Sequence, residues 1–321
     1  MDFYRVVKHM KEGASIMKFS VLTDMLGTEV FEEALKQTRN LGFPAIELRA
    51  KLDGNTIDKI SLEEARVLKE KVDRFELQVS TLSSWAVNPC TFSGPPKYDN
   101  YDEEHHNRMS DILDRLCDVA DVLDASYIRV YSLYRQENFN ELPDEEKEKQ
   151  YKHNASIMRK HAEQIERRSK VLLVENEPPT LSSTLEELGK LVQYANHPNL
   201  KINWDIINGW RAGEYPTAAL YEQHIKGHVG QTHLKGAVTK EGSISKENPE
   251  GSFGNFAIAG QDDFDHKSII EAIAKGDPEA IMTIDTHYPS LYEQDKIGEV
   301  EVMRRCKQFF DSILAEVNAS D

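Results

Sequence analysis

The sequence has few cysteines and a deficit of positive charge. Its three cysteines, Cys90, Cys117 and Cys306, are an odd number at wide spacing and include no C-x-x-C pair, so a disulfide framework or redox couple is not predicted. Lys and Arg number 39 against 55 Asp and Glu, a formal net charge of −16. This charge opposes binding to nucleic acid phosphates and anionic lipids, and we expect neither as a partner.

Long hydrophobic runs are also missing. No stretch approaches the roughly 20 apolar residues that a membrane span requires, and residues 1–18 lack the apolar core of a signal peptide. We therefore expect a cytoplasmic protein in which residues 1–18 form an N-terminal helical extension. Residues 19–321 are expected to form one domain.

Eight short β-rich runs, each followed by an amphipathic stretch, predict a single (β/α)₈ TIM barrel of the α/β class. A doubly wound open sheet alternates in the same way, but its first strand usually leads into a glycine-rich phosphate turn, and TDMLGTEVF has one glycine. The eight expected strands are Phe19–Leu26, Ala45–Ala50, Leu77–Ser84, Tyr127–Tyr134, Val171–Glu177, Leu200–Ile206, Ile225–Leu234 and Ala280–Thr286.

Helix boundaries are marked by capping residues. Ser61 with Glu64, and Ser183 with Glu186, have capping-box spacing and predict two helix starts. Gly42 follows Leu41 at a position where the end of a helix favours positive φ.

Two connections after strands are unusually long: Trp85–Asn107 and Lys235–Asp265. Long βα loops in a barrel stand at the catalytic face, so we expect them to form walls or lids of a pocket. A disordered surface insertion is the alternative interpretation.

One ionisable residue lies near the end of each of the last four expected strands: Glu175 in VENEPP, Asp205 in NWDIIN, His233 in QTHLKG and Asp285 in TIDTHY. Each alone is more often a helix cap or an ion-pair partner. Together, three carboxylates and an imidazole converging at one barrel mouth would repel one another without a cation between them. An oxygen-rich set with one nitrogen suits one divalent ion, Mn²⁺, Mg²⁺, Co²⁺ or Zn²⁺.

The segments VLLVENEP, LKINWDIINGWRAGEYP, HVGQTHLKG and MTIDTHY resemble the last four repeats of the xylose-isomerase-like TIM barrel superfamily of sugar isomerases and epimerases. The first half resembles it mainly by strand rhythm and by AIELR. The resemblance implies metal ligation by Glu175, Asp205, His233 and Asp285. Asp285 is one methylene shorter than the Glu usual there, which leaves its acid/base role open. Asn208 stands where several relatives have His, which implies substrate binding without titration.

Further polar and aromatic residues are predicted around the metal. Glu47 would contact substrate hydroxyls or form an ion pair with Arg49 or another base. Trp85 would stack on the C–H face of a sugar or belong to the barrel core. Arg211 would bind an anionic substrate group or tie down a loop. Strand parity places Lys235 beside His233 and His287 beside Asp285.

The resemblance implies an isomerase or epimerase that acts on a sugar or sugar-derived keto compound. The ion would chelate the carbonyl and an adjacent hydroxyl, Glu175 would remove the neighbouring proton, and Asp285, Lys235 or His287 would be its partner. Glu177 ranks below Glu175 because the following Pro-Pro suggests that the strand has ended. The same site would also suit a lyase or dehydratase, and an apurinic endonuclease or a non-catalytic sugar-binding barrel are weaker alternatives. Relatives imply a homo-oligomer.

Overall fold

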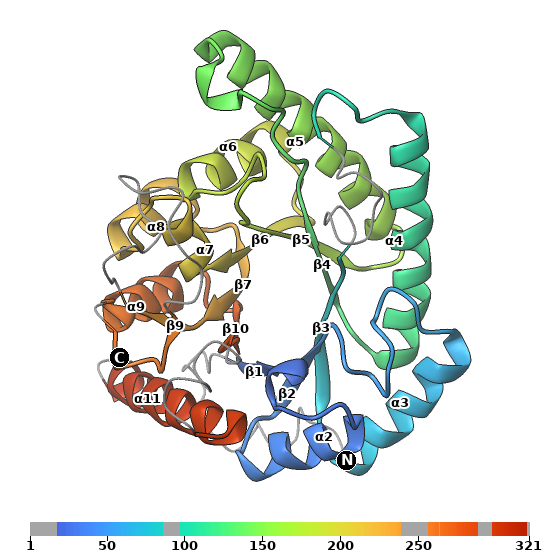
Figure 1. Ribbon diagram of the computed structural model, residues 1–321, viewed down its shortest axis with the longest axis vertical. Helices are drawn as coiled ribbons and strands as arrows, with labels where there is room; N and C mark the ends of the chain where they lie inside the picture. Colours follow the sequence, from blue (N-terminus) through green and yellow to red (C-terminus); the bar gives the residue numbers. More distant parts are fainter. Residues whose placement is uncertain (1–17, 86–96, 239–255, 263, 288–296, 320–321) are drawn as a thin grey trace.

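The computed structural model describes residues 18–85, 97–238, 256–262, 264–287 and 297–319. Eight parallel strands close into a barrel in the order β1-β10-β7-β6-β5-β4-β3-β2, and Figure 1 looks into their ring with the helices outside it. The predicted single (β/α)₈ barrel is confirmed. The strands are β1 (Lys18–Leu22), β2 (Ala45–Leu48), β3 (Gln78–Ser83), β4 (Tyr127–Tyr131), β5 (Val171–Glu175), β6 (Leu200–Asp205), β7 (Val229–Leu234) and β10 (Ile281–Ile284).

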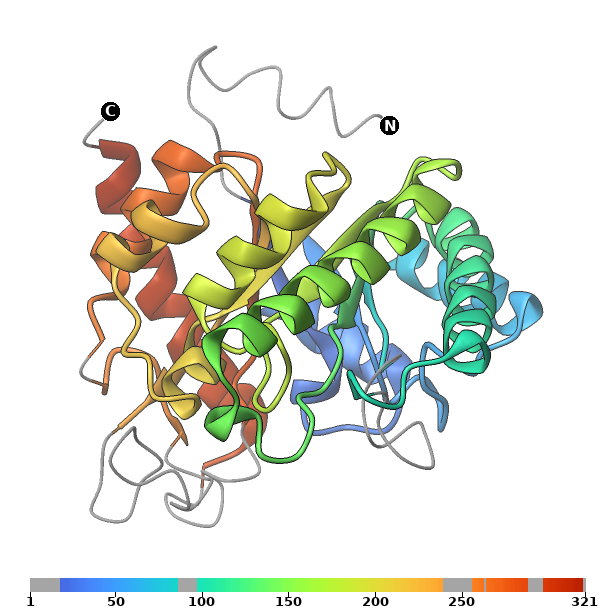
Figure 2. The same ribbon diagram turned by 90° about the horizontal axis from the view of Figure 1, so that it is seen from above.

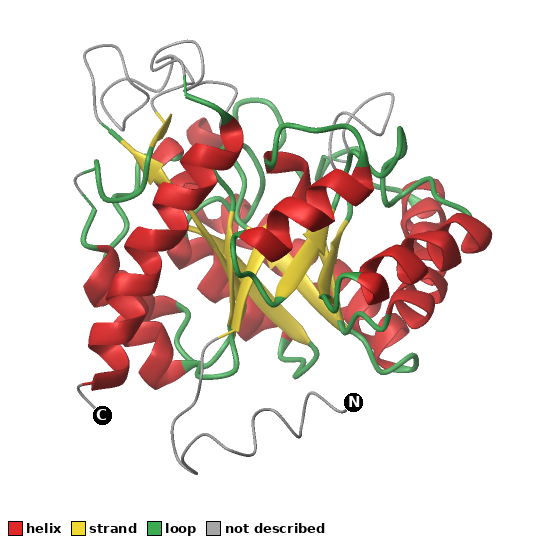
Figure 3. Ribbon diagram, turned by 90° about the horizontal axis from the view of Figure 1, so that it is seen from below, coloured by secondary structure: helices red, strands yellow, loops and turns green. Residues whose placement is uncertain are grey.

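The helices form an outer layer, seen from the side in Figures 2 and 3, because each has one apolar stripe to bury. In α6, for example, Leu188, Leu191 and Val192 are buried while Glu186 is exposed. The main helices are α2 (Phe31–Asn40), α3 (Leu62–Arg74), α4 (Glu103–Leu123), α5 (Asp144–Glu166), α6 (Leu185–Ala195), α8 (Ala218–His224), α9 (His266–Gly276) and α11 (Glu299–Ala319). Shorter elements are η1 (Thr23–Met25), η2 (Phe139–Glu141), α7 (Ile206–Arg211) and the antiparallel pair β8 (Gly236–Ala237) and β9 (Phe256–Ala257).

The structure confirms the expected helix boundaries, except that the second capping box lies one residue further along the chain. Ser61 and Glu64 form the predicted capping box, and Gly42 has φ of 78° just beyond α2. The second box uses Thr184 and Glu187, so the expected pair Ser183 and Glu186 was wrong by one residue. Glu187 takes the role because its Oε2 also accepts from the backbone N–H of Ser183 at 2.9 Å.

The observed strands are shorter than the expected ranges, and two of their limits differ by four residues. β1 ends at Leu22 rather than Leu26, because the chain turns into η1 and the Thr23 hydroxyl donates to the Glu47 carbonyl at 3.3 Å. β7 begins at Val229 rather than Ile225, because the Asp277 carboxylate holds the preceding turn and accepts the N–H of Val229 at 3.1 Å. The β8–β9 pair inside the second long loop was not predicted.

Several expectations concern the ends and surface of the chain. The expected N-terminal helix falls on residues 1–17, outside the described residues, and Lys18 already belongs to β1. Cys117 and Cys306 are buried free thiols, and Cys90 lies outside the described residues. Within the described ranges, no helix has both the length and the apolar character needed to cross a bilayer.

Asp277 is the main polar anchor at the start of β7, on the face of the barrel opposite the carboxyl ends of the strands. Its carboxylate accepts from the Tyr221 hydroxyl at 2.6 Å and from the N–H groups of Gly227 and Val229 at 2.9 and 3.1 Å. We expect Asp277→Ala to lower the free energy of unfolding by about 3 kcal/mol, since buried donors lose a charged acceptor. Urea unfolding followed by circular dichroism measures the change.

The matched control is Asp73→Ala, which removes an exposed carboxylate paired with Lys69 on α3 and should change stability by less than about 0.5 kcal/mol. Asp277→Asn should fall between the two. Equal stability of Asp277→Ala and the parent would show that the three hydrogen bonds do not support the barrel.

Candidate functional site

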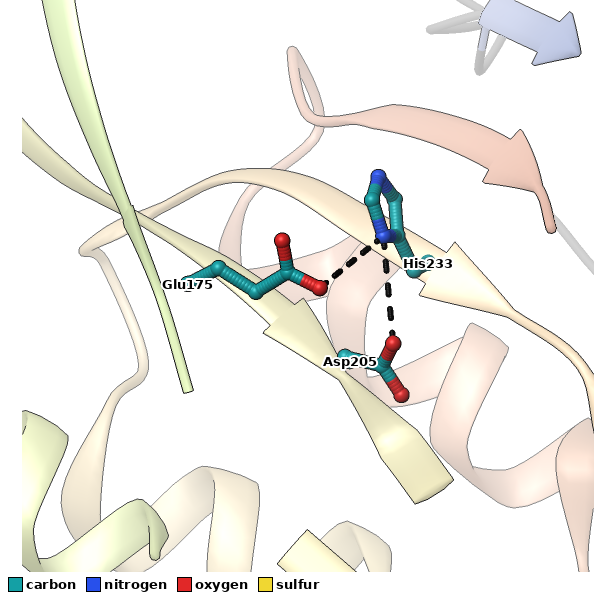
Figure 4. A group of neighbouring side chains, drawn as sticks. All are labelled: Glu175, Asp205 and His233. Atoms are coloured by element: carbon teal, nitrogen blue, oxygen red, sulfur yellow. Dashed lines mark ion pairs between the residues drawn. The ribbon is translucent and has the colours of Figure 1, made fainter. Parts of the chain in front are cut away.

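Glu175, Asp205 and His233 come together at the carboxyl ends of three adjacent strands, β5, β6 and β7. Parallel pairing aligns them, because Asp205 lies opposite His233 and Glu175 opposite Asn203. Each offers one ligand atom, and these atoms lie within 4.8 Å of one another in a fully buried position. Figure 4 shows the three side chains pointing toward one another. Among the described residues, this is the one group of three or more such side chains that could hold a metal ion.

Asp205 is both a helix cap and a member of this group. Its Oδ1 accepts from the N–H groups of Ile207 and Asn208 at 2.9 and 3.0 Å, which starts α7. Its Oδ2 is left facing His233 Nδ1 at 3.8 Å and Lys235 Nζ at 2.6 Å. Burial alone would raise the pKa of Asp205, but the Lys235 ammonium and His233 hold it below its usual value.

Glu175 is held by an arginine that sequence analysis did not single out. Its Oε1 lies 3.2 Å from His233 Nδ1, while its Oε2 pairs with Arg129 Nε at 2.9 Å. The Arg129 side chain is fully buried, and it also donates to Ser83 Oγ at 3.2 Å and to the Ser84 carbonyl at 3.1 Å. The available signal was the arginine within the apolar run YIRVY, because a buried guanidinium requires a carboxylate partner.

Glu47 is the hydrogen-bond partner of His233 Nε2. Its Oε2 lies 3.0 Å from His233 Nε2, and Ser83 Oγ and Gln231 Nε2 also donate to its carboxylate. Burial disfavours the charged form, but His233 and the other neighbours lower the pKa of Glu47 to about 2. Of the two ion pairs expected for Glu47, the structure shows the one to another base, because Arg49 pairs instead with Asp24 at 2.9 Å.

This pairing leaves the other nitrogen of His233 available. With the proton on Nε2 and donated to Glu47, the Nδ1 lone pair points at Glu175 and Asp205, and Nδ1 has no hydrogen-bond partner although it is buried. A carboxylate behind a histidine is the usual way to fix the tautomer of a metal ligand.

Asp285 lies beside the group of three rather than within it. Its Oδ2 is 3.8 Å from His233 Nδ1, 2.7 Å from Lys235 Nζ and 3.0 Å from His287 Nε2. Lys235 and His287 thus both lie against the Asp285 carboxylate. His287 has a left-handed backbone, with φ of 45°, and its ring stacks on Phe256 of β9 at 5.0 Å.

Asn208, Arg211 and Glu177 form a second layer. Asn208 Nδ2 donates to Glu177 Oε2 at 2.8 Å, and Arg211 Nη1 donates to Asn208 Oδ1 at 2.7 Å and lies 3.5 Å from Glu177 Oε1. Burial, together with the carboxylates of Glu175 and Asp205 and despite Arg211, raises the pKa of Glu177 to about 7. β5 does end at Glu175, as the Pro-Pro suggested, yet Glu177 still reaches the site through Asn208.

Trp85 follows β3 and is partly buried, with its backbone N–H donating to Asp58 at 2.9 Å. Residues 86–96, about half of the first long loop, and 239–255, most of the second, lie outside the described residues. The lid predictions for these loops therefore remain predictions. The expected end of the first loop at Asn107 was wrong, because Asp102 caps α4 and the helix begins at Glu103.

The charges of the site leave a deficit that one divalent ion would balance. The ion-paired network around His233 contains four carboxylates, Glu47, Glu175, Asp205 and Asp285, and two permanent cations, Arg129 and Lys235. Burial lowers the pKa of His233, but Glu47 and Glu175 raise it well above its usual value, because carboxylates outnumber cations around the ring. A divalent ion would supply the two missing positive charges and leave a neutral imidazole as ligand, so the donor set fits such an ion.

Solved structures share this fold along nearly the whole chain. The IOLI protein, solved "with a binding zinc atom", has a TM-score of 0.72 at 15% identity, covering 94% of this chain and 99% of that one. The probable 3-DHS dehydratase AsbF from Bacillus anthracis has a TM-score of 0.66 at 16% identity, covering 92% and 99%. D-allulose 3-epimerase from Methylomonas sp. has a TM-score of 0.66 at 13% identity, covering 92% and 98%. These similarities show the fold.

Sequence comparison identifies the family directly. No curated protein matches the chain. The sequence profile described as "Xylose isomerase-like TIM barrel" matches residues 35–306, which include seven of the eight barrel strands and all the site residues discussed above except Asp24. The chain therefore belongs to the xylose isomerase-like TIM barrel family.

Proposed function

We propose that this protein is a divalent-metal-dependent isomerase or epimerase that acts on a sugar or sugar-derived keto compound by removing a proton next to a carbonyl. The observation that carries the proposal is the buried group of Glu175, Asp205 and His233, whose ligand atoms lie within 4.8 Å. The negative charge of the surrounding network supports it. So does the similarity in fold to the zinc-containing IOLI protein and to sugar 3-epimerases.

The bound ion would polarise the carbonyl and stabilise the negative charge of the enediolate. In this proposal Glu175 removes the proton, and Arg129 holds its carboxylate in place from behind. Glu177, which is joined to the site through the Asn208 amide at 2.8 Å, is a candidate to return a proton to the substrate. Asp285, with Lys235 and His287, faces Glu175 from three strands away round the barrel and is the alternative proton carrier.

The remaining predicted residues take positioning or binding roles in the proposal. Glu47 acts through His233, which it orients, rather than on the substrate. Trp85 supplies an apolar wall, and Asn208 and Arg211 bind substrate oxygens at the edge of the site. A cytoplasmic location and a homo-oligomer remain predictions.

A lyase or dehydratase would use the same site and the same first step. It would then expel a β-substituent from the enediolate instead of returning the proton. His287, bound to Asp285 at 3.0 Å, is a group that could protonate such a leaving group. Product analysis separates the two reactions.

We expect about one divalent ion per chain after incubation with Mn²⁺ or Zn²⁺ and gel filtration, measured by elemental analysis. The double substitution Glu175→Gln with Asp205→Asn should abolish uptake, since two of three ligand atoms lose their charge. Asp277→Asn, on the opposite face of the barrel, is the matched control and should retain the ion. A double variant with the metal content of the parent would contradict the ligand set.

Turnover in D₂O tests the proton-abstraction chemistry. With Mn²⁺ and a panel of free ketoses, phosphorylated ketoses and keto-inositols, deuterium should enter the reacting carbon at a rate comparable to turnover. Mass spectrometry of substrate and product measures it. A product free of deuterium, combined with full activity of Glu175→Gln, would favour a hydride shift near Lys235 instead.

Glu177→Gln should keep the metal content of the parent and lower kcat by about 10²- to 10⁴-fold, the usual range for a lost general acid or base. If protonated Glu177 donates, kcat of the parent should fall as pH rises through neutrality, and the variant should lack this limb. Glu214→Gln is the matched control, because burial also raises the pKa of Glu214 to about 7 but its carboxylate only caps the start of α6. Equal losses in both variants would remove Glu177 from the mechanism.

A further inference from the structure

We infer that the metal centre of this chain has three protein ligands: Glu175, Asp205 and His233. Asp285 is not a fourth ligand, because its carboxylate is the ion-pair partner of Lys235, whose ammonium is a second cation beside the metal. The inference rests on the proposed function, because it concerns how the ion of that site is held. It departs from the four-ligand set that the sequence resemblance implied.

The Asp285 carboxylate is already engaged. Its Oδ2 accepts a hydrogen bond from Lys235 Nζ at 2.7 Å and lies 3.0 Å from His287 Nε2. It does not belong to the group whose ligand atoms lie within 4.8 Å of one another.

Lys235 depends on Asp285 remaining where it is. The Lys235 side chain is fully buried, and its ammonium pairs with two carboxylates, Asp205 at 2.6 Å and Asp285 at 2.7 Å. Removing one partner from a buried ion pair is strongly destabilising, because the remaining charge is left uncompensated. If Asp285 moved to the metal, Lys235 would keep only Asp205, whose Oδ2 is itself one of the proposed ligands.

The charges also balance under this arrangement. The four carboxylates Glu47, Glu175, Asp205 and Asp285 are matched by Arg129, which pairs with Glu175, by Lys235, which pairs with Asp285, and by the two charges of the ion. Lys235 thus places a fixed positive charge next to the metal, where it can stabilise a second substrate oxygen. Asp285 Oδ1 is buried without a hydrogen-bond partner and is available to a substrate hydroxyl.

Zn²⁺ affinity tests the inference without any substrate. Competition with a chromophoric chelator should show a loss of at least about 100-fold for Asp205→Asn, the matched control. The loss for Asp285→Asn should be at least about tenfold smaller, because that variant removes a partner of Lys235 and no ligand of the ion. In a Lys235→Met variant, Asp285 loses its ion-pair partner and becomes free to bind the ion. Adding Asp285→Asn to that variant should therefore lower its Zn²⁺ affinity by about tenfold or more.

The absorption spectra of two Co²⁺-loaded variants test the ligand set independently of affinity. The absorption spectrum of the Co²⁺-loaded protein should be unchanged by Asp285→Asn, since the ligands of the ion are unchanged. Asp285→Glu, which is one methylene longer, should change that spectrum and tighten Zn²⁺ binding.

Loss of affinity in Asp285→Asn equal to that in Asp205→Asn, with an altered Co²⁺ spectrum, would overturn the three-ligand inference while leaving the proposed function standing. A parent protein that binds no divalent ion would instead overturn the proposed function.

Discussion

The site is governed by the cost of burying like charges. Four carboxylates meet at one end of the barrel with two permanent cations among them, and all six side chains are buried. Such a cluster is stable only if protons or a bound cation supply the missing charge. The pKa of His233, which burial by itself would lower, is raised by Glu47 and Glu175 and reflects the same excess of negative charge. The same deficit makes the site suited to a divalent ion.

The barrel makes this concentration of charge tolerable by giving each carboxylate a specific partner. Arg129 holds one oxygen of Glu175, the start of α7 holds one oxygen of Asp205, and Lys235 holds Asp285. Each partner engages one side of a carboxylate and leaves the other side facing the site. The ligand atoms are thereby oriented before any ion arrives, which reduces the reorganisation that binding requires.

The residues that stabilise the barrel and the residues of the candidate site lie at opposite ends of the strands. At the start of β7, Asp277 satisfies three buried donors and has no contact with the metal group. At the carboxyl end of the same strand, His233 and Lys235 face the site. This division is general for barrels, because the helices pack along the strands and leave one rim free to carry the reacting groups.

The sequence by itself determined the fold and the identity of the central residues. Strand rhythm predicts eight parallel strands, and the position of Glu175, Asp205, His233 and Asp285 at strand ends brings them to one rim. Strand parity adds Lys235 and His287, because successive side chains alternate between the two faces of a strand. Tertiary structure alone decided the partnerships. That Arg129 pairs with Glu175, that Glu47 serves His233 rather than Arg49, and that Asp285 is bound by Lys235 depend on distances across the barrel. Closure of the sheet sets those distances, and the burial of each side chain decides which of several possible ion pairs forms. A linear sequence pattern contains neither kind of information.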